Sequence, residues 1–229
     1  MAIASDMRVV RNLMTLRELT LEKMRGTILS FRFKPGDRLV ERDLCEQLGV
    51  SRSIVREVLR HLEAEGQVEI MPQRGPIVAN PTTEQAGQIY EIRAMLEALA
   101  ARGCAETSDR RFVRDLDAAI RRIEIAYAAS NSGGVLSETN EFYRILFEAG
   151  GKAVAWTIVR SLNARINHLR AMTIATKGRA KDGVAEMKRI VDAIRRGDGD
   201  KAHQACIDHV GRAAKIAQDV LANTGNTKT

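Results

Sequence analysis

The chain has 229 residues and a formal net charge of +7, and 45% of its residues are hydrophobic but only 4% aromatic. This length allows two modest domains or one large one, and the composition suits cores packed mainly from aliphatic helices. No apolar run approaches the roughly 20 residues that cross a bilayer, and the N-terminus lacks the pattern of a signal peptide, so we expect a soluble cytoplasmic protein.

The positive charge is spread along the chain. Residues 1–80 hold 13 Lys or Arg against 11 Asp or Glu, and the remaining residues hold 23 against 18. The net charge is therefore weak support for binding a polyanion, which must be argued from the face that the arginines occupy. Cys45, Cys104 and Cys206 lie far apart in apolar helical patterns without the spacing of a zinc site, so we expect reduced core thiols.

Three short helices are predicted near the N-terminus, after a flexible segment over residues 1–15. The first covers about Leu16 to Phe31, and the second covers Arg42 to Leu48 and ends at Gly49. The third follows Ser51, whose hydroxyl can cap a helix start. Its apolar residues recur at the spacing of one buried helical stripe, namely Val55, Val58, Leu59 and Leu62.

The opposite face of the third helix is basic. It carries Arg52, Ser53, Arg56 and Arg60, and residues four apart stand above one another on a helix. Guanidinium groups suit phosphates and guanine edges. Helix, glycine turn and helix together form a helix-turn-helix, so this face predicts DNA recognition. The alternatives are an ordinary surface helix and a protein-interaction module, but the latter would need an apolar face.

A hairpin is predicted directly after the third helix. Residues 67–71 alternate as a strand, residues 72–75 form a turn, and residues 76–79 return as the partner strand. Three helices followed by a hairpin describe a winged helix-turn-helix over residues 16–80. Arg74 lies at the wing tip beside Gly75, where the missing side chain allows close approach to the minor groove. A plain surface turn is the alternative.

The rest of the chain is predicted to be a bundle of six to seven helices. A linker over residues 81–84 follows Asn80, and the helical domain covers residues 85–223, with a disordered tail over residues 224–229. The expected helices are Glu84 to Glu106, Asp109 to Ser130, Leu136 to Ala149, Ala153 to Thr176, Arg179 to Gly197 and Asp198 to Asn223.

Nearly the whole chain resembles the GntR-type bacterial transcription regulators, specifically the FadR branch with an all-helical FCD effector domain. The resemblance is carried by LSFRFKPGDRLVERDLCEQLGVSRSIVREVLRHLEAEGQVEI in the first part, and by EIRAMLEALAAR and IVDAIRRGDGDKAHQACIDHV in the second. It implies a homodimer that binds a palindromic operator, and a repressor is preferred over an activator. A small organic acid in the bundle would alter the orientation of the two winged helices. The positions that match the family's DNA contacts are Arg42, Ser51, Arg52, Ser53, Arg56, Arg74 and Gly75.

The chain departs from this family at the metal site that many members carry. The family pattern has an Asp and a His four apart on one helix, followed by two further His. Here Thr139, Tyr143 and Met187 stand at the first three places, and only His209 remains. Without the anionic ligand and two imidazoles these side chains cannot hold a divalent metal well, so we predict a metal-free pocket.

Arg93 is the predicted anchor of that pocket, because a buried arginine needs an anionic partner. The partner is either a ligand carboxylate or Glu97 one turn along the helix. The remaining lining is expected from Thr139, Tyr143, Asn163, Asn167, Met187 and His209, with Arg165 as a further candidate. His168 and His203 are expected at the surface. The alternative is a vestigial helical domain that no longer responds to an effector.

The hypothesis from a different functional class is that the protein is an enzyme. Tyr143, His209 and Glu186 have the side-chain chemistry for acid–base catalysis in a helical bundle. However, the chain has no nucleophile elbow, phosphate loop or paired metal motif, and its four histidines form no recognisable constellation. We therefore predict that the protein is not an enzyme.

Overall fold

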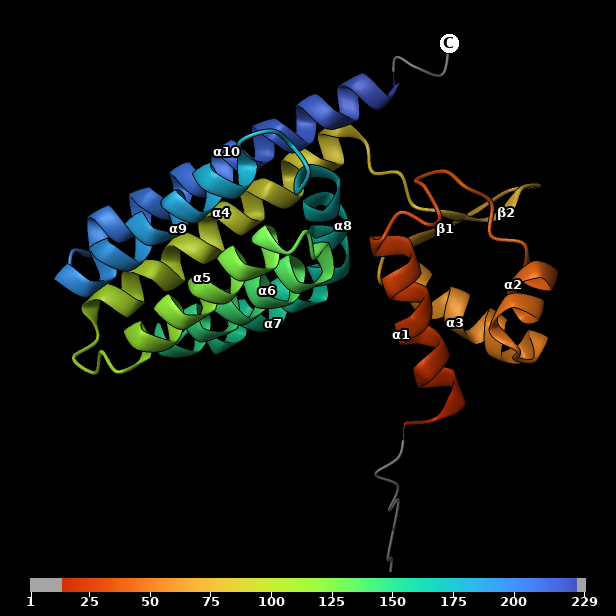
Figure 1. Cartoon of the computed structure of the whole chain (residues 1–229), viewed down its shortest axis with the longest axis horizontal. Coiled ribbons are helices and arrows are strands. Elements are labelled where there is room, and N and C mark those ends of the chain that lie inside the picture. Colours follow the sequence, from red (N-terminus) through yellow and green to blue (C-terminus); the bar gives the residue numbers. More distant parts are fainter. Residues whose placement is uncertain (1–13, 226–229) are drawn as a thin grey trace, which may run out of the picture.

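The computed structural model describes residues 14–225, which form ten helices and one hairpin in two bodies connected by residues 79–82 (Figure 1). The first body contains α1 (Leu16–Leu29), α2 (Glu41–Leu48), α3 (Arg52–Ala64), β1 (Val68–Met71) and β2 (Gly75–Val78). The second body contains α4 (Thr83–Glu106), α5 (Phe112–Ala128), α6 (Ser132–Ala149), α7 (Ala153–Ser161), α8 (Asn163–Thr173), α9 (Arg179–Arg196) and α10 (Gly199–Gly225). The predicted fold class, a winged helix-turn-helix followed by a helical bundle, is confirmed.

Local signals explain where the first helices begin and end. Thr15 and Glu18 form a reciprocal capping box at the start of α1, which satisfies two backbone amides. Helix α2 ends at Gly49, whose φ of 65° lies in the left-handed region that glycine adopts without strain. The apolar stripe of α3 packs into a core with α1 and the hairpin, and its four predicted residues are all buried.

The hairpin is antiparallel, with Val68 opposite Val78 and Met71 opposite Gly75. The turn needs positive φ values at Gln73 and Gly75, which are 66° and 76°. A neighbouring segment was not predicted to join it: the Leu39 amide donates to the Pro76 carbonyl at 2.8 Å and extends this small sheet.

The second body is a bundle with its own core, separate from that of the first body. Helix α4 runs alongside α10, and α9 and α6 also pack against it (Figure 1). Cys104 and Cys206 are buried free thiols in this part of the chain, whereas Cys45 is half-buried in the first body. Among the described residues, no helix is long and apolar enough to cross a membrane.

The single helix expected over Ala153 to Thr176 is wrong, because the chain breaks at Leu162 into α7 and α8. The Leu162 amide bonds to the Val159 carbonyl at 3.1 Å, a tighter turn than the α-helix allows. No glycine or proline marks this break. Of the expected flexible ends, residues 1–13 and 226–229 lie outside the described residues, while α10 continues to Gly225, past the expected limit of the bundle.

Candidate functional sites: a basic helix face and a cationic cavity

The N-terminus of α3 presents a cluster of polar side chains. Ser51 caps the helix, with its Oγ accepting from the Ile54 amide at 3.5 Å and lying 2.9 Å from the Ser53 hydroxyl. Arg52 and Arg56 lie on the next turns, with 63% and 56% of their side chains exposed. The predicted face is therefore formed by residues that are free to meet a partner in solution.

Glu41 on α2 holds two of these arginines in place. Both of its carboxylate oxygens accept from Nε of Arg56 at 3.0 Å, and Nε of Arg52 lies 3.7 Å away. This contact raises the pKa of Arg56. Arg42, 82% exposed, pairs with its neighbour Asp43 instead. Sequence reasoning missed Glu41, because its partners lie across the turn between two helices.

The wing presents Arg74 at its tip, where it is exposed to solvent. Gly75 next to it is required for its φ of 76° rather than for space, since a Cβ there would meet nothing within 4 Å. The seven predicted contact residues thus come from α2, the start of α3 and the wing, all within the first body.

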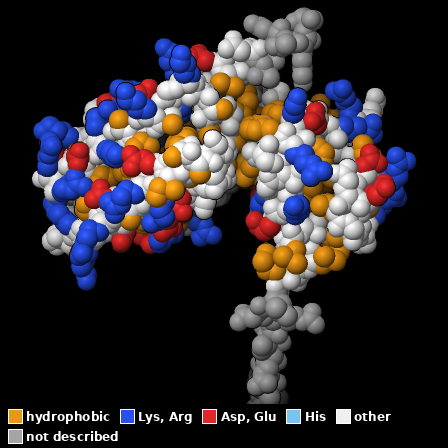
Figure 2. Space-filling view, viewed as in Figure 1, with side chains coloured by type: hydrophobic (Ala, Val, Ile, Leu, Met, Phe, Trp, Pro, Cys, Tyr) orange, Lys and Arg blue, Asp and Glu red, His pale blue; other side chains and the backbone are white. Residues whose placement is uncertain are grey.

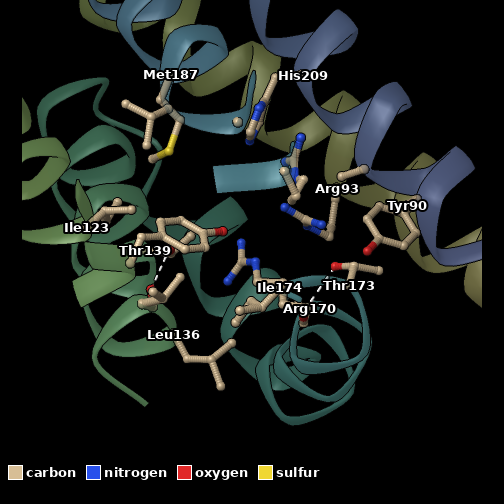
Figure 3. Close-up of a pocket in the computed structure, with 16 residues that line it drawn as sticks. Tyr90, Arg93, Ile123, Leu136, Thr139, Arg170, Thr173, Ile174, Met187 and His209 are labelled. Carbon is tan, nitrogen blue, oxygen red and sulfur yellow. Dashed lines mark hydrogen bonds between the residues drawn. The ribbon is translucent and has the colours of Figure 1, made fainter. Parts of the chain in front are cut away.

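The bundle encloses a cavity of about 50 Å³ between α4, α5, α6, α8, α9 and α10. Arg93, Arg170 and His209 extend into the space bordered by Thr139 and Met187 (Figure 3). The cavity is also lined by Arg179. Arginines from three helices therefore surround one small space.

Arg93 pairs with Glu97 inside the protein. Glu97 was one of the two partners that the sequence allowed, the other being a ligand carboxylate. Nε of Arg93 donates to a Glu97 oxygen at 2.8 Å, and the two residues are 2% and 0% exposed. Burial alone would lower the pKa of Arg93, but the Glu97 carboxylate raises it. The guanidinium also lies 5.0 Å from the ring centre of Tyr90. The charge of Arg93 is thus balanced within the protein by Glu97.

Arg170 on α8 has no such carboxylate. Its Nη1 donates to the side-chain oxygens of Asn140 at 2.9 Å and Asn167 at 3.3 Å, and its guanidinium lies 5.0 Å from the ring centre of Tyr143. Within the described part of the chain it forms no ion pair. Burial, and then the nearby Arg93 charge, lower the pKa of Arg170 to about 10. Among the described residues, this guanidinium therefore has no carboxylate in direct contact with it, although the more distant Glu97 charge raises its pKa.

Glu186 is the shared carboxylate partner of three basic side chains. It is 1% exposed and accepts from Nδ1 of His209 at 2.8 Å, from Arg179 at 3.0 Å and from Arg212 at 3.1 Å. Burial alone would raise its pKa, but His209 and Arg179 lower the pKa of Glu186 to about 2. Burial lowers the pKa of His209. Because the carboxylate is ionised, Nδ1 carries the proton of the neutral ring, and Nε2 is left as an acceptor.

Comparison with known protein families shows which family the chain belongs to. The FCD domain matches residues 88–212, more than half of the chain, and the bacterial regulatory proteins of the gntR family match residues 16–78. The chain belongs to the GntR family of transcriptional regulators, with an FCD domain. As a GntR-type regulator it binds DNA, and it is a regulator rather than an enzyme.

Two relatives of this GntR regulator align with it over most of their length. The chain is 24% identical over 200 residues to the uncharacterized regulator YdhC of Bacillus subtilis, covering 87% of this chain and 89% of YdhC. It is 23% identical over 197 residues to the transcriptional repressor RspR of Escherichia coli, covering 86% of each. A solved GntR regulator from Rhodococcus, 24% identical, has the same fold with a TM-score of 0.74 over 88% of this chain and 96% of that one.

The structure brings only part of the predicted FCD lining together. Arg93, Thr139, Met187 and His209 border the cavity. Tyr143 is buried behind it, stacked on Arg170, and its hydroxyl has no hydrogen-bond partner among the described residues.

The other expected lining residues lie elsewhere. Asn167 bonds to Arg170 without lining the cavity, and Asn163 is not part of the cavity but lies in a separate surface depression with Trp156 and Arg160. The expectation of a surface His168 is wrong, since it is 3% exposed, and His203 is half-buried.

The donors at the family's metal positions do not fit a divalent cation. Around the cavity these positions supply a hydroxyl from Thr139, a thioether from Met187 and one imidazole from His209. Transition metals in proteins favour several imidazole, thiolate or carboxylate ligands together. No group of three such side chains occurs close enough in the described part of the chain. Arginines surround this space instead.

Proposed function

We propose that this GntR regulator is a cytoplasmic repressor that binds a palindromic operator as a homodimer, and that a small hydroxy acid in the FCD cavity changes its affinity for DNA. The observation that carries the effector part is Arg170, a guanidinium at the cavity wall without a carboxylate partner. The cavity holds three arginines against the carboxylates of Glu97 and Glu186. A ligand carboxylate supplies the missing negative charge.

The other polar groups define the rest of this ligand. Thr139 donates its hydroxyl proton to the Val135 carbonyl at 2.7 Å, which leaves its oxygen as an acceptor. Nε2 of His209 is a second acceptor. A ligand that donates to these atoms while its carboxylate meets Arg170 is a hydroxy acid. The cavity of about 50 Å³ holds roughly four water-sized positions, which limits the ligand to a short chain.

Helix α8 offers a route from the cavity to the DNA-binding body. Arg170, Thr173 and Ile174 line the cavity from α8 or its end, and α8 also packs against α1. His168 on the same helix lies 6.2 Å, ring centre to ring centre, from Phe31 in the turn that follows α1. A ligand that shifts α8 therefore biases the orientation of the winged helix.

DNA contact is assigned to the seven residues on α2, α3 and the wing. Arg52 and Arg56 would enter the major groove, where one bidentate contact to guanine contributes about 1–3 kcal/mol of discrimination. Arg42, Ser51 and Ser53 would bind the backbone, while Arg74 and Gly75 would approach the minor groove. Glu41 accepts only from Nε of Arg56, so DNA can use that donor only when the contact breaks, whereas Glu41 leaves the Nη groups of both arginines free for DNA.

The proposed dimer surface is an exposed apolar stripe on α4 and α7. Met95 and Leu99 are 62% and 43% exposed on α4, and Val154 and Ile158 are 78% and 46% exposed on α7, which packs against α4. Large apolar side chains gathered on adjacent helices favour an isologous contact with a second copy. Such a pair would present two equivalent winged helices, which would suit the proposed palindromic operator.

Native mass spectrometry and thermal unfolding test the effector part. Glycolate, lactate and glycerate are added to the full chain, with acetate and propionate as acids that lack the hydroxyl. We expect a hydroxy acid to bind and raise the Tm of the wild type but not of Arg170→Met, while the surface control Arg160→Gln responds like the wild type. An equal response in Arg170→Met, or binding of none of these acids, would contradict the proposal and favour an effector-independent FCD domain.

A further inference from the structure

A second and larger cavity lies between the two bodies. It has a volume of about 640 Å³, and β1, the turn after α3, the first half of α4 and the segment from Leu162 to Leu169 border it. The space-filling view shows a deep indentation between the bodies, with hydrophobic side chains gathered where they meet (Figure 2). None of its lining residues also lines the cavity at Arg170, so the two spaces are distinct.

His168 is the unusual residue of this interdomain cleft. It lines the cleft, is 3% exposed, and neither of its ring nitrogens has a hydrogen-bond partner among the described residues. Burial lowers the pKa of His168, so the ring is neutral and offers one donor and one acceptor. Buried polar groups in folded proteins are nearly always hydrogen-bonded, so two unpartnered nitrogens on one buried ring point to a ligand that bonds to them.

The walls of the cleft are mainly apolar. Ile70 and Met71 on β1 are 52% and 38% exposed, and Ile92 on α4 is 36% exposed. The charged residues at the cleft are of both signs, with Glu63 and Glu69 on the DNA-binding side and Arg165 on the helical side. Such a lining favours an occupant with an apolar body and no net charge.

We propose that the interdomain cleft binds a small neutral molecule with an apolar ring or chain and one hydroxyl or amide group, which hydrogen-bonds to His168. The cleft volume lies within the range of about 300–1,000 Å³ that is usual for sites of small organic ligands. Because its two sides belong to different domains, an occupant contacts the winged helix and the FCD domain together and fixes the angle between them.

This second site is coupled to the acid site through α8. His168 borders the cleft, and Arg170, two residues further, lines the cavity. Two ligands that bias the position of one helix alter each other's affinity by the same factor. The neutral ligand is thus a second input to the regulator. Its binding at His168 does not depend on the acid proposal, whereas its coupling to the acid site rests on that proposal.

The test uses 1-naphthol, a neutral apolar bicycle with one hydroxyl group, and the full-length protein labelled with ¹⁵N at histidine. We expect saturable binding that shifts the ring signals of His168, identified by their loss in His168→Phe. Ile70→Glu, a change at an exposed position that leaves the core intact, and His168→Phe should each weaken binding at least tenfold. The control His203→Gln, on α10, should bind like the wild type.

Three results would overturn the proposal. The first is that naphthol leaves the His168 signals unmoved at saturation. The second is unchanged affinity in Ile70→Glu. The third is binding that occurs only in a monomeric variant, which would mean that a second copy covers the cleft. Arg170→Met should retain naphthol binding, so that a failure at the acid site is distinguished from a failure at the cleft.

Discussion

Replacing Arg93 or Arg170 by methionine should change the stability of the protein by very different amounts, although both arginines line the same cavity. The fall in the pKa of Arg170 from 12.5 to about 10 corresponds to about 3 kcal/mol of destabilisation at neutral pH, where the group is charged in both the folded and unfolded chain. Arg170→Met relieves this cost. It also removes the hydrogen bonds to Asn140 and Asn167, at about 1 kcal/mol each, and the contact with Tyr143, at about 1 kcal/mol.

These contributions nearly cancel, so the free energy of unfolding of Arg170→Met should stay within about 1 kcal/mol of the wild type. Arg93→Met, by contrast, leaves the Glu97 carboxylate buried without a partner, which costs about 3–5 kcal/mol. For a protein of this size that lowers Tm by on the order of 10 °C.

Thermal and urea unfolding, followed by circular dichroism in a buffer without organic acids, measures both changes. The wild type and the surface variant Arg160→Gln serve as references. Equal destabilisation in Arg170→Met and Arg93→Met would refute the reasoning, because it would show that Arg170 is compensated as fully as Arg93.

Three further predictions concern other parts of the molecule. Glu41→Gln should tighten DNA binding a few-fold in fluorescence anisotropy, because it frees Arg52 and Arg56 from the Glu41 carboxylate. The control Glu57→Gln on the same body should bind DNA like the wild type. Weaker binding by Glu41→Gln would contradict the role of Glu41. The folded-state pKa of Glu186, about 2, lies below its ordinary value of 4.5. Its ionised form therefore contributes about 3 kcal/mol to the free energy of unfolding above pH 4.5, and this contribution is lost as the pH falls toward 2. Glu186→Gln should flatten this acid dependence in unfolding experiments, and an unchanged slope would show that the cluster does not ionise as described. Met95→Glu should yield monomers in analytical ultracentrifugation, whereas Ile125→Glu, 67% exposed on α5, should not; two dimeric variants would exclude the stripe.

Local signals made the DNA-binding domain predictable. The capping Ser51, the apolar stripe of α3 and the glycine at the end of α2 each act within one or two helical turns, and the turn before Gly75 is equally local. Periodicity therefore predicted α3 and the hairpin to within a few residues. Glu41 was missed because its contact with Arg56 depends on the angle between two helices.

The cavity was only partly predictable for the same reason. Thr139, Met187 and His209 could be placed by resemblance to a family, but Arg170 and Arg179 matched no family position that the sequence revealed. The break at Leu162 has no glycine or proline, and a continuous helix was therefore expected through Arg170. His168 was misplaced because its burial comes from packing between the two bodies, which the pattern within one helix does not contain.

The central claim is that an acid bound at Arg170 controls operator binding, and footprinting tests it most directly. DNA from upstream of the gene for this chain is titrated with the wild type, Arg56→Ala and Arg170→Met, with and without the hydroxy acid that most raises Tm. We expect a two-fold symmetric footprint that Arg56→Ala loses, and at least a tenfold acid-dependent shift in half-protection that Arg170→Met loses. An asymmetric footprint, or an acid effect of equal size in the wild type and Arg170→Met, would contradict the account.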